Sequence, residues 1–439
     1  MKPRLLFLFA DQWDRAALAA DTALHERFTV VHEGFDLFRF PECARILAFD
    51  ARAWIDRMAA RWRHAGVAGV VSTHEPYGAL IAAILAQRLG LPGAEPAALV
   101  RAQHKFHARQ VLAQALPEAN PAFALLPHTL GGPGGAGTSL PYPFFAKPVK
   151  GTFSILARRV ADERDLASLL TFGRFEAHLI RRLVRPFADL MPVAPDCTVD
   201  PLRMMGESLM TGVQVNVDGW FDRGAPGCFG VVDAVTYPGT DAFARFEYPS
   251  RLPAPLQARA RDTAQRALQA LKFTHGAYNV ELFVDPVSGA CRVIEVNPRF
   301  AAQFGDLYAR VDGTHPYAVL ADLATGRTPA WTVRAGPDRA AASFVLREFS
   351  TAPKRAPTRA ERAWLAARHP GARLHTFVKR AAGRAREAKW LGSHRYAIVN
   401  MGGADRDDLA RRYADILAHV RFGDDAPLAV DPQPDALPR

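Results

Sequence analysis

The segment that decides the fold covers residues 278–299 and reads YNVELFVDPVSGACRVIEVNPR. Two runs rich in Val, Ile, Leu and Phe flank the sequence DPVSG at residues 285–289, which is strong turn chemistry. The segment therefore predicts an antiparallel β-hairpin. Opposed residues in a hairpin have numbers with a constant sum, and a turn centred near Ser288 makes that sum 288 + 288 = 576. This register sets Glu281 opposite Glu295.

The two opposed glutamates predict a metal site. Their Cβ atoms would lie roughly 5 Å apart, and the carboxylates would repel each other unless a cation lay between them. Asn297 follows Glu295 by two residues and shares its face of the strand. Carboxylate and amide oxygens suit Mg²⁺, which completes its shell with water and phosphate. The alternative is a solvated hairpin with surface acids, and a one-residue slip of register would separate the two faces.

The first hundred residues alternate short apolar runs with helical spacing. Residues 5–10 and 67–71 have the length of strands, and residues 77–89 have the spacing of a helix that ends at Gly90. This alternation predicts a parallel sheet covered by helices. A further helix over residues 105–116 ends before Pro117.

A glycine-rich tract at residues 131–137 formally satisfies the pattern G-x-G-x-x-G over residues 132–137. A dinucleotide-binding loop must follow a strand and open a helix, so that the helix N-terminus meets the pyrophosphate. Prolines at 127, 133, 141 and 143 surround the tract instead. We interpret it as a linker.

After this tract the pattern changes to that of a strand-rich α+β region. Residues 144–149 and 155–160 read as strands, residues 207–217 lead into a strand that turns at Asp218-Gly219, and residues 230–236 return from it. Residues 253–271 read as a helix. The C-terminal part predicts strands near residues 341–346, 374–378 and 396–399 and a helix from 405 to about 420.

The order of these motifs resembles the ATP-grasp superfamily of carboxylate–amine ligases over roughly residues 1–330. The resemblance rests on Glu281, on the sequence EVNPR at residues 295–299, and on FFAKPVKGTFS at residues 144–154. It implies an α/β and α+β protein with an ATP-grasp fold. The expected parts are a Rossmann-like pre-ATP-grasp domain (1–103), an ATP-grasp domain (104–330) with a lid subdomain at about 144–212, a small C-terminal α+β subdomain (331–425) and a flexible tail (426–439).

The resemblance also assigns roles to individual residues. It implies that ATP and Mg²⁺, or Mn²⁺, bind, with the metal held by Glu281, Glu295 and Asn297. Arg299, a planar donor fork, and Lys147 are the expected catalytic residues. The nucleotide would be held by Lys105, Lys147, Gly151, Ser154, Glu207, Ser208, Met210 and Gln214. The sequence departs from the family at Gln214, where many relatives have Glu, and in the loop after Lys147, where Phe153 and Ile155 replace glycine.

The implied function is an ATP-dependent ligase, which forms an acyl phosphate from a carboxylate and joins it to an amine with release of ADP and phosphate. FEYPS at residues 246–250 and Asn297-Pro-Arg299 resemble the amino-acid and dipeptide ligases of the carnosine synthase kind. A biotin carboxylase-like or purine-biosynthetic carboxylate enzyme is the first alternative. A non-catalytic ATP-binding regulatory protein is the second. Small-molecule substrates are the expected partners, and an oligomer is compatible with the sequence.

Composition limits the other classes of function. With 439 residues and 49% hydrophobic residues, the chain excludes a small disulfide-held module and wholesale disorder. The net charge of +11 invites a nucleic-acid partner, but no stretch is a continuous basic block and no RNA-binding or zinc motif accompanies it. The four cysteines form no Cys-x-x-Cys pair, and no apolar run resembles a signal peptide or a membrane span. We expect a cytoplasmic protein.

Overall fold

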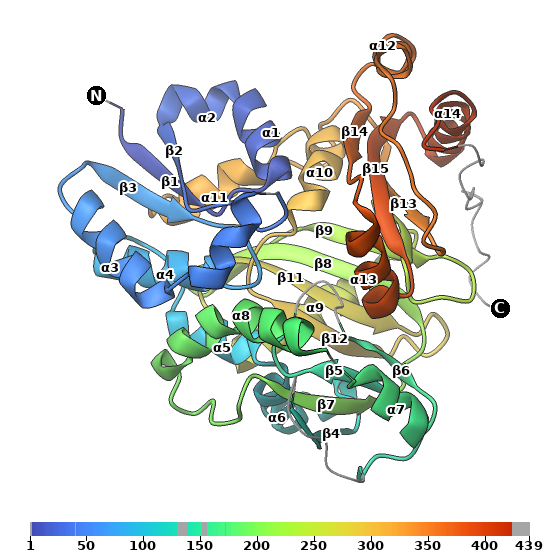
Figure 1. The fold of residues 1–439 in the computed structure, drawn as a ribbon. Coiled ribbons are helices and arrows are strands. Elements are labelled where there is room, and N and C mark those ends of the chain that lie inside the picture. Colours follow the sequence, from blue (N-terminus) through green and yellow to red (C-terminus); the bar gives the residue numbers. More distant parts are fainter. Residues whose placement is uncertain (1, 40, 130–137, 152–155, 172, 424–439) are drawn as a thin grey trace.

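The computed structural model describes residues 2–39, 41–129, 138–151, 156–171 and 173–423. Within these residues the strands form three sheets, and Figure 1 shows the largest of them in the centre of the molecule. A small parallel sheet lies at the N-terminal end of the chain. A four-stranded sheet, coloured green, lies below the central one, and the C-terminal segment extends the central sheet at its far side.

The N-terminal sheet has the strand order β2 (Thr29–Glu33), β1 (Arg4–Leu8), β3 (Val67–Val71), and all its strands are parallel. This confirms the parallel sheet that the sequence predicts. Helix α11 (Pro316–Ala324) packs so closely against β3 that a Cβ on Gly69 would lie 2.8 Å from the carbonyl oxygen of Ala324. The other helices of this part are α1 (Gln12–Ala20), α2 (Thr22–Arg27), α3 (Ala51–Trp62) and α4 (Gly78–Arg88).

The four-stranded sheet has the order β4 (Phe123–Thr129), β7 (Arg203–Ser208), β5 (Phe144–Pro148), β6 (Arg158–Val160) and is antiparallel. Its core includes Phe144, Leu166 and Ile180. Helices α7 (Glu163–Leu169) and α8 (Arg174–Leu190) come from the same stretch of chain. The predicted glycine-rich linker at residues 131–137 lies outside the described residues, and so does residue 155 of the predicted strand at 155–160.

The central sheet has eight antiparallel strands. In spatial order they are β12 (Cys291–Asn297), β11 (Gly276–Val284), β8 (Val213–Asp222), β9 (Ala225–Thr236), β10 (Phe243–Tyr248), β13 (Ala340–Glu348), β15 (His394–Gly403) and β14 (Arg373–Thr376). The C-terminal strands therefore continue the sheet that carries the 278–299 hairpin. The remaining helices are α9 (Ala254–Ala270), α10 (Gly305–Asp312), α12 (Arg359–Arg368), α13 (Ala381–Leu391) and α14 (Arg406–His419).

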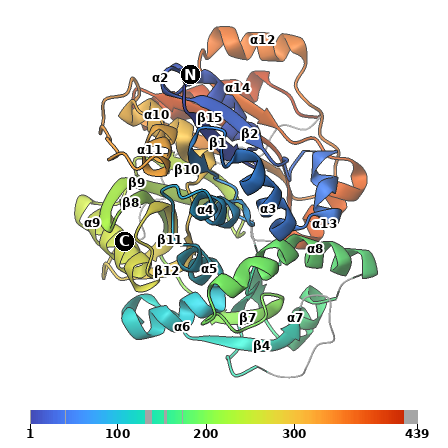
Figure 2. The ribbon, with the colours of Figure 1, turned by 90° about the vertical axis from the view of Figure 1, so that its left-hand side faces the viewer.

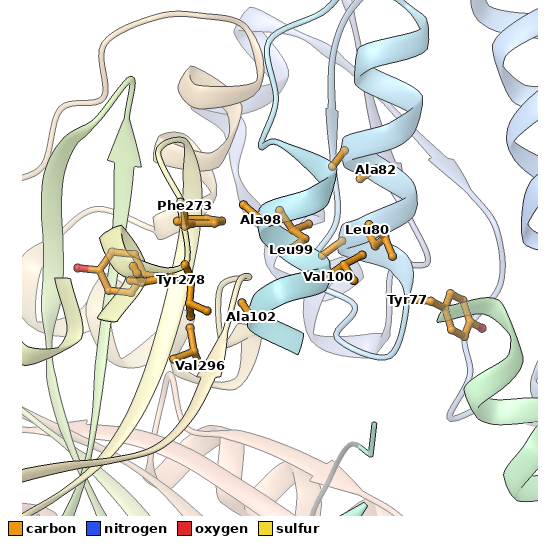
Figure 3. Packing of buried hydrophobic residues seen from close by; sticks show 14 of the residues in the cluster. Tyr77, Leu80, Ala82, Ala98, Leu99, Val100, Ala102, Phe273, Tyr278 and Val296 are labelled. Carbon is orange, nitrogen blue, oxygen red and sulfur yellow. The ribbon is translucent and has the colours of Figure 1, made fainter. Parts of the chain in front are cut away.

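One apolar core joins the N-terminal part to the central sheet. Helix α5 (Pro96–Gln103) follows α4, and Figure 3 shows Ala98 and Ala102 of α5 on the side of the helix toward Phe273 and Val296. Figure 2 shows α4 and α5 between α3 and the strands β11 and β12. Residues 78–86 of α4 are all buried, as expected for a helix covered on every side. This packing fixes the loop after β3 relative to the hairpin.

The predicted turn at Asp218-Gly219 is wrong. Strand β8 runs through both residues, and the turn to β9 lies at Arg223-Gly224, which have φ values of 49° and 88°. Positive φ at both central residues is the conformation of a tight two-residue hairpin turn. Gly219 serves packing instead, because a Cβ there would lie 2.3 Å from the carbonyl oxygen of Gly227 and 2.5 Å from the hydroxyl of Tyr278.

Candidate active site

The predicted register of the 278–299 hairpin is confirmed at the glutamates. Glu281 pairs with Glu295, and Asn279 pairs with Asn297, so the sum of residue numbers is 576 at this end. Nearer the turn Leu282 pairs with Val293 and the sum is 575. A β-bulge at Ile294 accounts for the change. The turn is thus centred half a residue earlier than expected, and the bulge restores the register that opposes the two carboxylates.

The bulge is held by cations from outside the hairpin. Arg109, on helix α6 (Lys105–Ala115), donates hydrogen bonds from Nη1 to the carbonyl oxygen of Val293 (2.7 Å) and from Nη2 to that of Ile294 (2.8 Å). Lys147 Nζ also donates to Ile294, at 3.2 Å. Strand carbonyls that the bulge withdraws from the ladder are therefore paired with charged donors.

Arg109 and Lys147 share one buried carboxylate. Glu207 accepts from Arg109 Nε at 2.7 Å and Nη2 at 3.0 Å, and from Lys147 Nζ at 2.8 Å. Burial alone would raise the pKa of Glu207, but the charges of Arg109 and Lys147 lower it to about 2. Burial lowers the pKa of Lys147. This network connects β7, β5, α6 and β12 through charge-assisted hydrogen bonds.

The opposed glutamates differ in their surroundings. Lys105 Nζ lies 2.7 Å from Glu295 Oε1 and donates to the carbonyl oxygen of Gly151 at 2.6 Å. Burial lowers the pKa of Lys105, but Glu295 and Glu75 raise it by more. Glu281 has no such cation beside it, and burial together with the charge of Glu295 raises its pKa to about 7. The protonated form of Glu281 is therefore favoured unless a cation lies beside it.

Amide side chains complete the acidic end of the hairpin. Gln214 Nε2 donates to Glu281 Oε2 at 3.3 Å, and Asn297 Nδ2 donates to Asn279 Oδ1 at 3.1 Å. Asn279 Nδ2 in turn donates to Asp218 Oδ1 at 2.8 Å. The nitrogen of Asn297 is used in this network, so its oxygen remains available as a ligand. Gln214 thus lies against the acidic pair.

The N-terminal part also reaches the hairpin. Arg299 Nη2 lies 2.9 Å from Glu75 Oε2, on the loop that follows β3. Gln103 Nε2 donates a hydrogen bond to the backbone carbonyl oxygen of Glu75 at 2.9 Å. Burial raises the pKa of Glu75, but Arg299 and Lys150 lower it by more. The carboxyl end of the parallel sheet therefore faces the acidic pair, as is usual for binding sites in α/β folds.

A small hollow, referred to below as the pocket, lies between α5, α6, β5 and β12. Its lining contains three of the cations and one of the carboxylates described above. The lining residues are Ala102, Lys105, Ala108, Arg109, Leu112, Lys147, Val293, Ile294, Glu295 and Val296. The pocket combines apolar walls with a charged end.

Of the three remaining predicted residues, the structure describes Ser208 and Met210, and neither lines this pocket. Ser208 ends β7, and its amide already donates to the carbonyl of Ala122 at 2.8 Å. Met210 lies in the short segment between β7 and β8 and is partly exposed. Ser154 lies outside the described residues. Within the described residues no three His, Cys, Asp or Glu side chains converge on one point, so any metal needs Asn297 or non-protein ligands as well.

Sequence reasoning missed Arg109 and Lys150 as parts of the site. Arg109 follows Lys105 by one helical turn, so the two cations share a face of α6. A charged residue on the inward stripe of a helix is a signal that could have found it. The pairing of Glu75 with Arg299 could not be predicted from local sequence, because the two residues are 224 positions apart in the chain.

The described part of the chain has no helix that is both long enough and apolar enough to span a lipid bilayer. Neither protein-family models nor curated proteins match the sequence.

Solved structures do match the fold. L-amino acid ligase from Bacillus licheniformis superposes with a TM-score of 0.74 at 17% identity, covering 96% of this chain and 98% of that one. N5-carboxyaminoimidazole ribonucleotide synthetase from Thermus thermophilus gives 0.61 at 17% identity, with 95% and 98% covered. The biotin carboxylase domain of 2-oxoglutarate carboxylase from Hydrogenobacter thermophilus, solved with MgADP, ADP and bicarbonate, gives 0.61 at 11% identity, with 96% and 91% covered. The chain therefore has the ATP-grasp fold that the sequence predicts.

Proposed function

We propose that this chain, which has the ATP-grasp fold, is an ATP-dependent ligase that activates a carboxylate as an acyl phosphate and joins it to an amine. The observation that carries the proposal is the opposed pair Glu281 and Glu295, set in register by a bulge and bordered by Lys105, Lys147 and Arg299. The likeness to L-amino acid ligase over nearly the whole of both chains supports it. ADP and phosphate are the expected co-products.

The residues present fit Mg²⁺ and a nucleotide. Two opposed carboxylates and the free oxygen of Asn297 form the hard oxygen donor set that Mg²⁺ prefers. Burial, and then the charge of Glu295, raise the pKa of Glu281, and a cation bound between the two carboxylates would offset both effects. When bound, Mg²⁺ supplies positive charge that neutralises the phosphate oxygens during transfer.

The chain's own residues position the reactants. Lys105 and Lys147 line the pocket and donate to phosphate oxygens of the nucleotide. Lys105 therefore exchanges its ion pair with Glu295 for a contact with the nucleotide. Glu207 keeps Lys147 charged and in place. Gly151, Ser154, Ser208, Met210 and Gln214 belong to the proposed nucleotide site as well. Gln214, beside Glu281, uses an amide in place of a carboxylate toward the ribose.

Arg299 is the proposed catalytic contact to the transferring group. Its guanidinium stabilises the charge that develops on the acyl phosphate, and the amine then displaces phosphate to form an amide. No side-chain nucleophile is needed, because positioning and electrostatics carry the reaction. The proposed lid, about 144–212, includes β5, β6 and β7 and would close over the phosphates of the nucleotide.

The test is a screen for ADP release across paired carboxylates and amines, with mass spectrometry of the product. The Glu295→Gln variant should lose ADP release while retaining the wild-type far-UV spectrum. A product with the mass of an amide supports the ligase, whereas ADP release that requires bicarbonate favours the biotin carboxylase-like or purine-biosynthetic alternative. ATP binding without ADP release under every mixture indicates the non-catalytic alternative. If Glu295→Gln retains the turnover of the wild type, the assignment of Glu295 as a metal ligand is wrong.

A further inference from the structure

Lys150 is a buried cation without a counter-ion. It follows β5 directly, its residue is 4% exposed, and no described side chain forms an ion pair or hydrogen bond with its ammonium. The ammonium lies over the ring of Phe187, 4.8 Å from the centroid. Burial lowers the pKa of Lys150 to about 8 even though the charges of Glu75 and Glu295 raise it. Holding an unpaired charge in this position costs the fold free energy.

His74 presents a buried donor to the same region. Its Nδ1 accepts the backbone N–H of Gly78 at 3.2 Å, at the start of α4, so the ring proton is on Nε2. That Nε2 is buried and has no hydrogen-bond partner among the described residues. Burial and the charge of Lys150 lower the pKa of His74 to about 3, so the ring is neutral.

Two further polar atoms without partners border residue 75. Arg299 uses Nη2 for Glu75, and its Nη1 is buried and unpaired within the described chain. Gln103 uses Nε2 for the carbonyl of Glu75, and its Oε1 is likewise buried and unpaired. Native proteins pair almost all such groups, so unpaired atoms that cluster in one place point to a ligand. Three of the four groups are donors, which favours an anion.

We propose that Lys150 and His74, together with Arg299, bind the carboxylate group of the substrate that is to be activated. The inference rests on the proposed function and deepens it. The three donors come from the segment after β5, the β3–α4 loop and the end of the hairpin, so all three parts must be assembled before the carboxylate is held. Gln103 Oε1 accepts from a donor elsewhere on the same substrate. Lys105 and Lys147, by contrast, remain assigned to the nucleotide phosphates.

The experiment measures KM separately for ATP and for a carboxylate that the ADP-release screen finds active. Lys150→Met should raise KM for the carboxylate at least about 10-fold, the usual value of a charged hydrogen bond, and leave KM for ATP within about 2-fold. Lys150→Arg keeps the charge, and its KM for the carboxylate should lie between the values of Lys150→Met and the wild type. The melting temperature of Lys150→Met should equal or exceed that of the wild type, because an unpaired buried charge is removed.

Lys354 offers a matched control. It is also a buried lysine over an aromatic ring, 5.6 Å from the centroid of Tyr396, but it is paired with Glu348 at 2.7 Å. Lys354→Met should lower the melting temperature and leave both KM values unchanged.

At His74 two variants separate the two nitrogens: Asn keeps an acceptor for Gly78 and loses the Nε2 donor, whereas Gln keeps the donor. Only His74→Asn should raise KM for the carboxylate at an unchanged melting temperature.

The outcomes distinguish this inference from the function on which it rests. If the wild type releases ADP but Lys150→Met changes KM for ATP alone, Lys150 belongs to the nucleotide site and the inference is wrong. An active Lys150→Met variant with an unchanged carboxylate KM also overturns it and leaves the ligase function intact. If the wild type releases no ADP with any carboxylate, the proposed function fails and the inference falls with it.

Discussion

The guanidinium of Arg109 donates five hydrogen bonds, which join helix α6 to β7, to β12 and to Asn120. It holds Glu207 with two of them, donates to the carbonyls of Val293 and Ile294, and reaches Asn120 at 3.2 Å. Arg109→Met would leave Glu207 with Lys147 alone, the carbonyl of Ile294 with Lys147 alone, and the carbonyl of Val293 without its charged donor. We expect the free energy of unfolding, measured by urea denaturation, to fall by roughly 3–5 kcal/mol.

A double-mutant cycle identifies the source of that loss. Adding Glu207→Gln to Arg109→Met removes the stranded buried carboxylate, so the pair should be less destabilised than the sum of the single variants. Additive effects would mean that Arg109 acts only through the strand carbonyls. Arg109→Lys is the conservative comparison, because a single ammonium cannot reproduce the forked contacts of the guanidinium.

The buried carboxyl group of Asp218 should make the free energy of unfolding depend on pH. It is fully buried and accepts hydrogen bonds from Asn279 and from the hydroxyl of Tyr308, both at 2.8 Å. Burial raises its pKa to about 7. Between about pH 4 and 7 the folded protein therefore holds a proton that the unfolded chain has released, so this residue's contribution to stability falls as pH rises.

The Asp218→Asn variant isolates that contribution. Its free energy of unfolding relative to the wild type should increase by roughly 3 kcal/mol between pH 5 and pH 7.5, since each pH unit is worth about 1.4 kcal/mol. Urea denaturation at several pH values measures it. Parallel curves for the two proteins would show that Asp218 is ionised in the folded state throughout. Glu281 remains in both proteins, so its own titration cancels in the difference.

At the scale of elements, α13 connects the C-terminal part to the four-stranded sheet. Trp390 of α13 is 7% exposed and belongs to the apolar cluster of Phe144, Leu166 and Ile180. Trp390→Ala should loosen this sheet, and we expect faster amide hydrogen exchange in residues 144–148 and 158–190 with less change elsewhere. Equal acceleration in every sheet would contradict a local role.

A neighbouring residue on the same helix provides the comparison. Lys389 pairs with Glu176 of α8 at 2.7 Å, but its side chain is 48% exposed. Exposed ion pairs contribute less than about 1 kcal/mol, so Lys389→Ala should leave the exchange pattern almost unchanged. The connection between α13 and the sheet would then rest on apolar packing.

The elements show where local sequence signals succeed and fail. The turn chemistry of residues 285–289 and the flanking β-branched residues are local, and they predicted the hairpin and the opposed glutamates correctly. The bulge at Ile294 left no such signal, because it is held by Arg109 and Lys147 from other parts of the chain. Asp218-Gly219 carried a turn signal, but the close contacts of Gly219 with Gly227 and Tyr278 decide its role.

At the scale of the whole molecule, the sequence predicted the three kinds of layer but not how they join. The C-terminal strands were expected in a small subdomain, and the structure pairs β13 with β10 inside the central sheet. Such pairings join residues about a hundred positions apart and depend on loop closure and packing. The contact of Glu75 with Arg299 is of the same kind. Non-local contacts of this sort complete the candidate site.

Because the candidate site draws on all these layers, nucleotide binding should stabilise the whole molecule. A ligand at 100 times its Kd raises the free energy of unfolding by about 2.7 kcal/mol if it binds only the folded state. We expect ADP with Mg²⁺ to raise the melting temperature more than ADP alone, and Mg²⁺ alone to have little effect. The measurement is a thermal melt of the full chain under each condition.

Two variants divide that stabilisation between the metal and the phosphates. Glu295→Gln should lose the increment that depends on Mg²⁺ and keep the response to ADP alone, because Lys105 and Lys147 remain in the pocket. Lys105→Met should weaken the response to ADP with or without the metal, since it removes a proposed phosphate donor and frees Glu295. If Glu295→Gln kept the full Mg²⁺ increment, the metal would bind elsewhere, and the opposed glutamates would be a structural pair held by Lys105.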